Sequence, residues 1–410
     1  MQKITLDLLI GASMPGGASC LTSVTELEPA AGPQASVAPA KFASTNSSDK
    51  RGVYAYERRF LDGVPSQAVI IDSKQSQLNR CEIAIAQAIT DGHPTLSLMP
   101  RVELAYQREG IDEVYSDLTL PHRIYDGHIR AGTVNGVPVT QLEMYRHIRN
   151  ASPANARAVL DASPVSLLFG SWDSSRATRQ GRWRSTLVGE IIGFCADDNS
   201  SLRGGARVDP VGMQIQLTET ALKNLAEAQR AELSVKLYEK AIKAGKNAGK
   251  GRGDVETLTS GSMLGLGGIP PTLDALSGVA CDRIIRSHVL SFAALRQMRF
   301  GAGVDGDAAC RALLAALALN ALARSDSELC LRANCDLREA GAANVAVDER
   351  GGGRVSLEPL AIAEADALLE AALAAACDKA GIRWNGVVMK VTGNAAVVAG
   401  AVADDNPEKE

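Results

Sequence analysis

The sequence is poor in aromatic side chains, which make up only 4% of its residues. Three tryptophans, seven tyrosines and six phenylalanines are too few to dominate a core, so the interior must depend on Ala, Val, Leu and Ile. At 410 residues the chain can bury a substantial core, as one large domain or as a few small ones.

The eight cysteines include no C-x-x-C pair, which argues against a structural zinc site. They are also too sparse for a disulfide scaffold in a chain of this length. We expect reduced, mostly buried thiols, as in a cytoplasmic protein, and neither a metal nor another cofactor.

Strong net charge and long apolar runs are also missing. A formal charge of −4 gives no global attraction for a polyanion, so any such site must be a local patch. No stretch reaches the roughly 18 apolar residues of a membrane span, and we expect no membrane partner. Asp7 interrupts the first apolar run, which predicts a strand over residues 3–10 in place of a signal peptide.

Several enzyme motifs are absent. The sequence has no H-E-x-x-H and no G-x-S-x-G, which weakens metalloprotease and hydrolase interpretations. The glycines around Lys250 lack the spacing of a phosphate-binding Walker loop. The stretch GLGGIPP at 265–271 places Pro270 where a dinucleotide fingerprint needs its third glycine.

The elements that the patterns predict are mixed and lack a regular βαβ alternation, which indicates an α+β fold. Residues 14–50 are rich in Ala, Gly, Ser and Pro, and predict a long loop or arm. Expected strands cover 3–10, 53–60, 67–71, 165–170, 185–195, 327–332 and 386–402. The run at 281–300 fits a strand or a helix, and a strand is favoured. Expected helices cover 139–150, 154–161, 217–245, 305–324 and 358–380.

A further helix is predicted from residue 72 onward. Asp72 and Gln75 have capping-box spacing. Apolar residues then recur at helical spacing at Leu78, Cys81, Ile85 and Ile89. Polar and basic side chains occupy the first turns at Lys74, Gln77, Asn79 and Arg80. A helix start of this kind suits a phosphate, although a solvated polar face is the alternative.

The window GSWDSSRATRQGRWRS at 170–185 holds two of the three tryptophans, and four arginines against one acid. Arginine binds phosphate in a bidentate manner, and tryptophan offers a stacking surface for an unpaired base. The window predicts a loop or irregular hairpin that binds single-stranded nucleic acid, or else an ordinary basic surface. Trp172 is the better stacking candidate, because Trp183 could instead enter the core.

Several segments, taken together, resemble one family. They are DSKQSQLNRCE at 72–82, LTLPHRIYDGHIR at 118–130, residues 167–194 around the window above, residues 264–301, and LCLRANCDLREAG at 329–341. In this order they resemble the backbone subunit of type I-G (formerly I-U) CRISPR interference complexes, a branch of the RAMP superfamily. The arm at 14–50 and the end after about residue 380 match poorly.

The resemblance implies a modified RRM-like, ferredoxin-type palm over residues 1–402, with inserted finger and thumb elements. Residues 196–215 and 243–272 both qualify as the thumb, and 403–410 would be a disordered tail. Such a subunit polymerises along one CRISPR guide RNA, presents the guide to target DNA, and contacts other subunits of the complex. It supplies no catalysis, since cleavage belongs to other subunits.

The resemblance also implies RNA-binding residues at the matching positions. They are Lys74, Gln77 and Arg80; His122 and Arg123; Ser171, Trp172, Ser174, Ser175, Arg176, Arg179, Gln180, Arg182 and Arg184; and Gly265, Gly267 and Gly268. Lys246 and Lys250 of the basic, glycine-rich run at 243–252 are added because of their charge.

A RAMP-type endoribonuclease, which processes guide precursors or cuts target RNA, is the alternative function. Some relatives cut RNA with a histidine or an aspartate near the strand. His122, His128 and Asp173 would then be the catalytic candidates.

Overall fold

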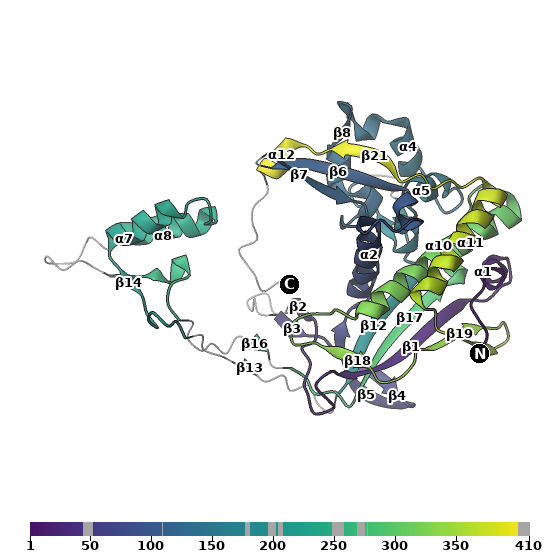
Figure 1. Cartoon of the computed structure of the whole chain (residues 1–410), viewed down its shortest axis with the longest axis horizontal. Coiled ribbons are helices and arrows are strands. Elements are labelled where there is room, and N and C mark those ends of the chain that lie inside the picture. Colours follow the sequence, from purple (N-terminus) through teal and green to yellow (C-terminus); the bar gives the residue numbers. More distant parts are fainter. Residues whose placement is uncertain are drawn as a thin grey trace. The chain divides into compact units, whose positions relative to one another are not determined.

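A computed structural model of the chain describes residues 1–43, 52–108, 110–176, 181–195, 202–203, 208–247, 258–268, 275–276 and 278–400 (Figure 1). The chain divides into two compact units. Unit 1 comprises the described residues within 1–40, 55–198 and 279–400, and unit 2 comprises those within 41–54 and 199–278. Helices and strands are mixed, which confirms the α+β class.

Unit 1 contains a large antiparallel sheet. Its strands, in spatial order, are β20 (Arg354–Leu357), β19 (Asn344–Asp348), β1 (Cys20–Pro29), β17 (Arg283–Ser291), β12 (Leu187–Phe194), β5 (Val64–Asp72) and β4 (Tyr56–Leu61). A short strand, β18 (Leu337–Glu339), also pairs with β1. Helix α2 (Lys74–Thr90) lies between β1 and β12 in the chain, and α10 (Gly303–Glu328) lies between β17 and β19.

These two helices cover one face of the sheet. Along β17 the side chains of Ile284, Arg286, His288 and Leu290 are buried, as the period of two predicts for one face of a strand. His288 Nε2 lies 3.1 Å from Gln77 Oε1 of α2, and Arg286 Nη2 lies 3.4 Å from Asp326 Oδ2 of α10. The interface between the sheet and these two helices therefore contains polar as well as apolar side chains.

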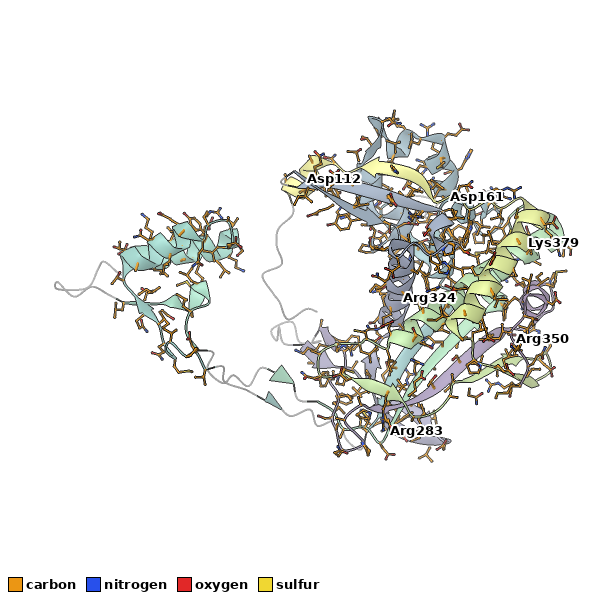
Figure 2. The ribbon with its side chains drawn as sticks, in the orientation of Figure 1. Asp112, Asp161, Arg283, Arg324, Arg350 and Lys379 are labelled. Carbon is orange, nitrogen blue, oxygen red and sulfur yellow. The ribbon has the colours of Figure 1, made fainter. Side chains whose placement is uncertain are left out.

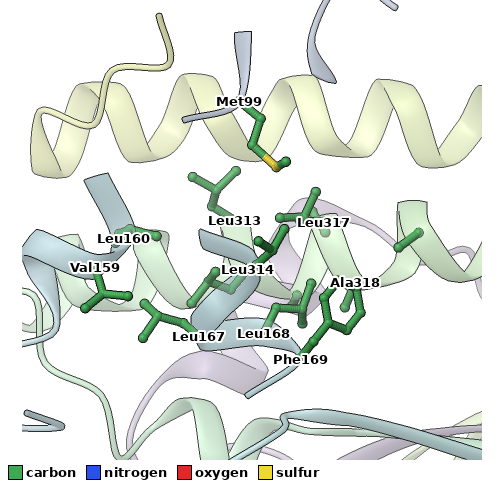
Figure 3. Packing of buried hydrophobic residues seen from close by; sticks show 14 of the residues in the cluster. Met99, Val159, Leu160, Leu167, Leu168, Phe169, Leu313, Leu314, Leu317 and Ala318 are labelled. Carbon is green, nitrogen blue, oxygen red and sulfur yellow. The ribbon is translucent and has the colours of Figure 1, made fainter. Parts of the chain in front are cut away.

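The core of unit 1 is centred on α10, which packs along α11 (Ile362–Ala380). Arg324, labelled in Figure 2, lies near one end of α10. Its Nη2 donates to Asp366 Oδ1 of α11 at 2.6 Å and joins the two helices there. Leu313, Leu314 and Leu317 of α10 belong with Met99 to one cluster of buried hydrophobic residues (Figure 3). By length and composition α10 could cross a membrane, but 94% of its most apolar stretch is buried within the structure, as in a core helix.

A second sheet has the order β7 (Ile111–Ser116), β6 (Arg101–Arg108), β21 (Val387–Thr392), β8 (Thr133–Val134) and β9 (Val137–Pro138). The pairing of β21 with β6 is parallel, and the other pairings are antiparallel. Short elements complete unit 1: α1 (Leu6–Ser13), η1 (Leu96–Leu98), η2 (Arg123–Tyr125), α3 (Gly127–Ala131), η3 (Val139–Gln141), α4 (Glu143–Arg149), α5 (Arg157–Ala162), α6 (Pro164–Leu168), β10 (Ser171–Trp172), β11 (Arg182–Trp183), α9 (Phe292–Leu295) and α12 (Ala395–Ala399).

Unit 2 is built from short strand pairs and two helices. The pairs are β2 (Lys41–Ala43) with β3 (Gly52–Tyr54), β13 (Leu202–Arg203) with β16 (Ala275–Leu276), and β14 (Gln216–Leu217) with β15 (Thr259–Ser260), followed by η5 (Gly261–Leu264). The single helix expected over 217–245 is instead two helices, α7 (Glu219–Ala228) and α8 (Val235–Asn247). Ser234 Oγ accepts from Leu237 N at 3.2 Å, an N-terminal cap that starts the second helix.

The structure confirms the helices expected near 72–89, 139–150, 154–161, 305–324 and 358–380, and the strand expected at 185–195. The strand over 3–10 was wrong, because that segment is α1, capped by Thr5 Oγ1 accepting from Leu8 N. The strand at 165–170 is α6, which has Pro164 at its start. The loop at 14–50 contains the central strand β1, and no strand covers 327–332 within the described chain. The tail at 403–410 lies outside the described residues.

Candidate nucleic-acid interface

A groove with a volume of about 1030 Å³ lies in unit 1. Its walls come from α2, from the loop that leads into η2, and from the β10–β11 hairpin with the residues beside it. The lining residues are Gln75, Asn79, Glu82, Ile83, Leu118, Thr119, Leu120, Pro121, His122, Arg123, Phe169, Gly170, Ser171, Trp172, Arg182, Trp183, Arg184 and Ser185.

Side chains alternate between the two faces of the β10–β11 hairpin. Trp172 pairs with Arg182 across the two strands, and Ser171 pairs with Trp183. Paired residues project from the same face of a hairpin, and successive residues project from opposite faces. Trp172 and Arg182 are accordingly exposed, whereas Ser171 and Trp183 are buried.

The two tryptophans of the window therefore have different roles. Trp183 is 6% exposed, and its Nε1 donates to the Tyr125 hydroxyl at 3.0 Å. Burial raises the pKa of Tyr125 to about 12, so this phenol stays neutral. Trp172 is 40% exposed, and the guanidinium carbon of Arg182 lies 4.7 Å from its ring centroid. Trp183 is thus a core residue, and Trp172 is a surface residue.

Positive charge faces the groove from β11 and the residue after it. Arg182 and Arg184 are both exposed, and neither forms an ion pair with a residue that the structure describes. His122 is also exposed on the lining. The one carboxylate in the lining, Glu82, is engaged by another arginine. The groove therefore offers an anionic ligand two cations that no described carboxylate neutralises.

That other arginine, Arg123, holds the wall of the groove in place. Its Nε and Nη2 donate to the two Glu82 oxygens at 2.5 and 2.8 Å, and its Nη1 donates to Gly170 O at 2.6 Å. Burial raises the pKa of Glu82, and Arg123 opposes that rise. Arg123 is only 6% exposed, so this predicted RNA-binding side chain is engaged inside unit 1.

Gly170, whose carbonyl oxygen accepts from Arg123, comes directly before β10. Its φ is +81°, a left-handed conformation that favours glycine. A Cβ at this position would come within 2.8 Å of Trp183 O and 2.9 Å of Ser185 N. The backbone of the two hairpin arms can therefore approach closely only with glycine at residue 170.

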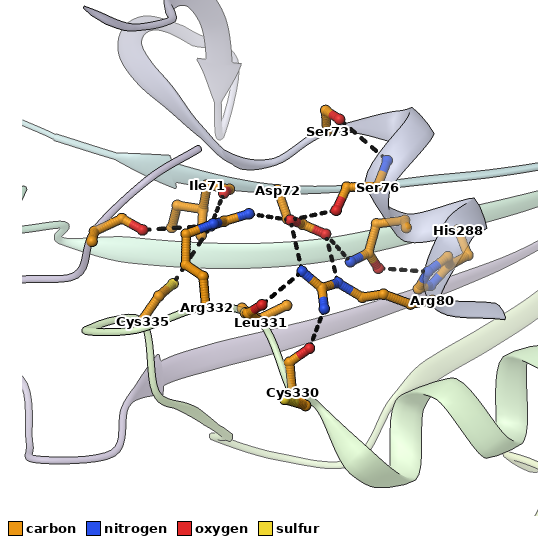
Figure 4. Close-up of polar contacts among 12 residues, drawn as sticks. Ile71, Asp72, Ser73, Ser76, Arg80, His288, Cys330, Leu331, Arg332 and Cys335 are labelled. Carbon is orange, nitrogen blue, oxygen red and sulfur yellow. Dashed lines mark hydrogen bonds and ion pairs between the residues drawn. The ribbon is translucent and has the colours of Figure 1, made fainter. Parts of the chain in front are cut away.

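The start of α2 is organised around a buried carboxylate, that of Asp72 (Figure 4). Gln77 Nε2 and Arg80 Nε donate to Asp72 Oδ2 at 2.6 and 3.0 Å, and Arg332 Nη2 donates to Oδ1. Burial would raise the pKa of Asp72, but the hydrogen bonds and charges of these partners hold it below its usual value. The Asp72 carboxylate is thus paired with both Arg80 and Arg332.

The predicted capping box at Asp72 was therefore wrong. The helix cap is Ser73, whose Oγ accepts from Ser76 N at 3.2 Å. Gln77 is buried, and Arg80 donates to Cys330 O and Leu331 O as well as to Asp72. Arg80, predicted to face a phosphate, thus ties α2 to a segment 250 residues further along the chain, and Gln77 is engaged by Asp72 and His288.

The other predicted residues of unit 1 are not among those that line the groove. Lys74 is exposed, with its Nζ 3.8 Å from Glu190 Oε2. Ser174 and Ser175 are exposed, and Arg130 pairs with Asp173 Oδ1 at 3.6 Å beside them. Arg176 Nη1 donates to Arg149 O at 2.8 Å and lines, with Arg182, a neighbouring cavity of about 310 Å³.

Three predicted residues, Arg179, Gln180 and Lys250, lie outside the described residues. The side chain of Lys246, near the end of α8, is also outside the described part. Gly265, Gly267 and Gly268 lie in unit 2. There Gly267 N donates to Asp209 Oδ2 at 2.9 Å, and Gly268 N donates to Met213 O at 3.1 Å. Their amides close a turn of unit 2.

Sequence reasoning identified the groove only in part. It placed Asn79 on the polar start of the helix but considered Gln75 only as part of a helix cap. Both line the groove from one face of α2, and Gln75 Nε2 donates to Asn79 Oδ1 at 3.1 Å. Their spacing of four residues was a signal that two amides share a helix face. The residues from Leu118 to Pro121 carried no comparable signal, because their exposure depends on how the loop packs.

The candidate catalytic residues each contact different partners. His128 Nδ1 lies 2.8 Å from the Tyr106 hydroxyl, whereas Asp173 is buried beside Arg130. Among the residues that the structure describes, no three His, Cys, Asp or Glu side chains come together as a metal-binding group.

Residues 21–198 match the model of a protein family described as CRISPR-associated protein GSU0053. The matched segment includes every residue that lines the groove. The match supports a CRISPR-associated role for this chain in antiviral defence. No curated protein matches the chain significantly.

Proposed function

We propose that the chain is the guide-RNA-binding backbone subunit of a type I-G CRISPR interference complex. The observation that carries the proposal is the groove of unit 1, where exposed Trp172 stands beside Arg182 and Arg184. These two cations form no ion pair with a described residue, and all three residues lie inside the segment that matches a CRISPR-associated family. Arginine and an exposed aromatic ring are the side chains that single-stranded RNA needs.

The order of the main sheet supports an RRM-like palm of the RAMP superfamily. The order β19-β1-β17-β12, with α2 after the first strand in the chain and α10 after the third, is that of a ferredoxin-like βαββαβ unit. The described residues of both candidate thumb segments, 196–215 and 243–272, lie in unit 2. We propose unit 2 as the source of the thumb and finger elements.

In this proposal the subunit recognises the guide by its backbone and leaves sequence recognition to base pairing with target DNA. Arg182 and Arg184 contact phosphates, which fixes the register of the strand without reading its bases. Each copy needs only a local cationic patch, which is compatible with a net charge of −4. Further copies continue along the guide and meet the other subunits of the complex in the cytoplasm.

The proposal is tested by purifying the full-length chain from cells with and without a CRISPR array. With the array, the chain should elute as a large assembly that carries RNA of one length. A monodisperse monomer without RNA under both conditions would contradict the proposal.

The proposed subunit binds RNA without cutting it, and the endoribonuclease alternative has its own assay. His122 is exposed on the groove and is the histidine best placed for such chemistry. We expect the chain to leave a labelled guide precursor intact, with or without divalent metal. Specific cleavage that His122→Ala abolishes would favour the endoribonuclease.

A further inference from the structure

We propose that Trp172 is a stacking platform for one unpaired nucleobase, which the groove of unit 1 seats against the amides of α2. This inference rests on the proposed RNA binding, and it adds a stacking contact with one base, whatever its identity, to the backbone contacts described above. Three features of the groove carry it.

The first feature is the exposure of Trp172. The other two tryptophans of the chain, Trp183 and Trp384, are each 6% exposed, whereas Trp172 is 40% exposed. Exposing so large a ring forgoes the free energy that its burial would give. Trp172 keeps this exposure although Arg182 covers one face of the ring, so ring surface remains open to a ligand.

The second feature is that the ring is already oriented. Cross-strand pairing places Arg182 beside Trp172, and the guanidinium carbon lies 4.7 Å from the ring centroid. A cation over one face restrains the tryptophan and leaves the opposite face for stacking. A base bound there would complete a sandwich of base, indole and guanidinium, with little further ordering of the protein.

The third feature is the chemistry of the surrounding groove. Its volume of about 1030 Å³ is at the upper end of the range for small-molecule sites, so it can hold a nucleotide. Gln75 and Asn79 present amide donors and acceptors, which suit the edge of a base. Arg184 adds an exposed cation for the neighbouring phosphate. Together these groups favour a nucleotide over an apolar peptide.

Tryptophan fluorescence tests the platform directly in the full-length chain. Titration with a synthetic single-stranded RNA should quench the exposed tryptophan, because stacked bases quench indole emission. Trp172→Phe should lose the RNA-dependent quenching. Trp384→Phe is the matched control, since it removes a buried tryptophan outside the groove, and it should retain the quenching.

Affinity separates stacking from charge. Trp172→Ala should weaken RNA binding about tenfold, and Trp172→Tyr should recover part of the loss. The salt dependence of binding should stay unchanged in both variants, because the ring carries no charge. Thermal unfolding of each variant checks that the hairpin remains folded. An RNA with one abasic position should bind the wild type more weakly than the intact RNA does. Trp172→Ala should bind the two RNAs equally.

The outcomes separate the two proposals. If wild-type chain binds RNA, and Trp172→Phe still shows quenching or Trp172→Ala binds as tightly, the platform is wrong and guide binding stands. Trp172 would then be a contact for a protein partner. If the wild type binds no RNA, both proposals fail.

Discussion

The guanidinium of Arg182 is stacked on Trp172 across the β10–β11 hairpin, with 4.7 Å between its central carbon and the ring centroid. Arg182 and Arg184 thereby face the groove together and form no ion pair with a described residue. Any phosphate that they neutralise must release counterions, which makes binding sensitive to salt.

The first prediction follows from these two charges. The double variant Arg182→Gln, Arg184→Gln should weaken RNA binding at low salt. It should also make the plot of log K against log salt shallower by about 0.7 for each phosphate that the variant no longer neutralises. Filter binding or fluorescence anisotropy across a salt series measures both effects.

Lys379→Gln is a matched control for charge, because Lys379 is an exposed cation at the end of α11 (Figure 2). This variant should keep the wild-type salt slope. A slope that is equally steep in the double variant and the wild type would remove Arg182 and Arg184 from the RNA interface.

The second prediction concerns the buried pair of Arg123 and Glu82. Arg123→Ala should lower the free energy of unfolding by about 3–5 kcal/mol, because it leaves the Glu82 charge buried without its partner. Arg123→Met combined with Glu82→Leu should be less destabilising than that single variant. Urea unfolding measures both. A change below about 1 kcal/mol in Arg123→Ala would show that the pair does not hold the groove wall.

The third prediction is a pH dependence that originates at Asp117. This carboxyl is fully buried, and burial raises its pKa to about 7. An unfolded aspartate ionises near pH 4, so the folded state binds more protons between about pH 4 and 7. The contribution of Asp117 to stability therefore falls as the pH rises through this window.

Asp117→Asn should remove this dependence and raise the free energy of unfolding at pH 8 by about 1–4 kcal/mol. The asparagine Oδ1 can still accept the hydrogen bond that Val102 N donates at 3.2 Å. Denaturant unfolding at pH 5 and pH 8 makes the comparison. A wild type and a variant that respond equally to pH would show that Asp117 is ionised in the folded state.

The fourth prediction concerns Gly189 of β12, which lies opposite His288 of β17. A Cβ at residue 189 would come within 2.0 Å of His288 Cδ2. Gly189→Ala should therefore destabilise the sheet by about 1–3 kcal/mol in thermal or urea unfolding. Gly11→Ala, in a helix with open space around Gly11, should instead be neutral or slightly stabilising. Equal effects of both changes would contradict this packing.

Helix α2 was predictable because Leu78, Cys81 and Ile85 follow the helical period and are buried together. Strand β1 was missed because its buried face includes Ser23 and Thr25 as well as Leu21 and Leu27. Thr25 Oγ1 accepts from the buried Arg286, so residue 25 is polar for a tertiary reason. A pattern of apolar residues alone cannot reveal such a strand.

The groove was predictable in part. The concentration of arginine and tryptophan at 170–185 identified the hairpin, and the alternation within its strands explains why Trp172 is exposed and Trp183 is buried. The partners of Arg80 were not predictable. Its carbonyl acceptors lie about 250 residues away, and only the fold brings them to the start of α2.

The most direct test of the account is the RNA that travels with the purified full-length chain when a CRISPR array is expressed beside it. The account predicts RNA of one uniform length in a large assembly, and release of that RNA at lower salt from the Arg182→Gln, Arg184→Gln variant. A wild-type monomer that carries no RNA, with or without the array, would contradict the account.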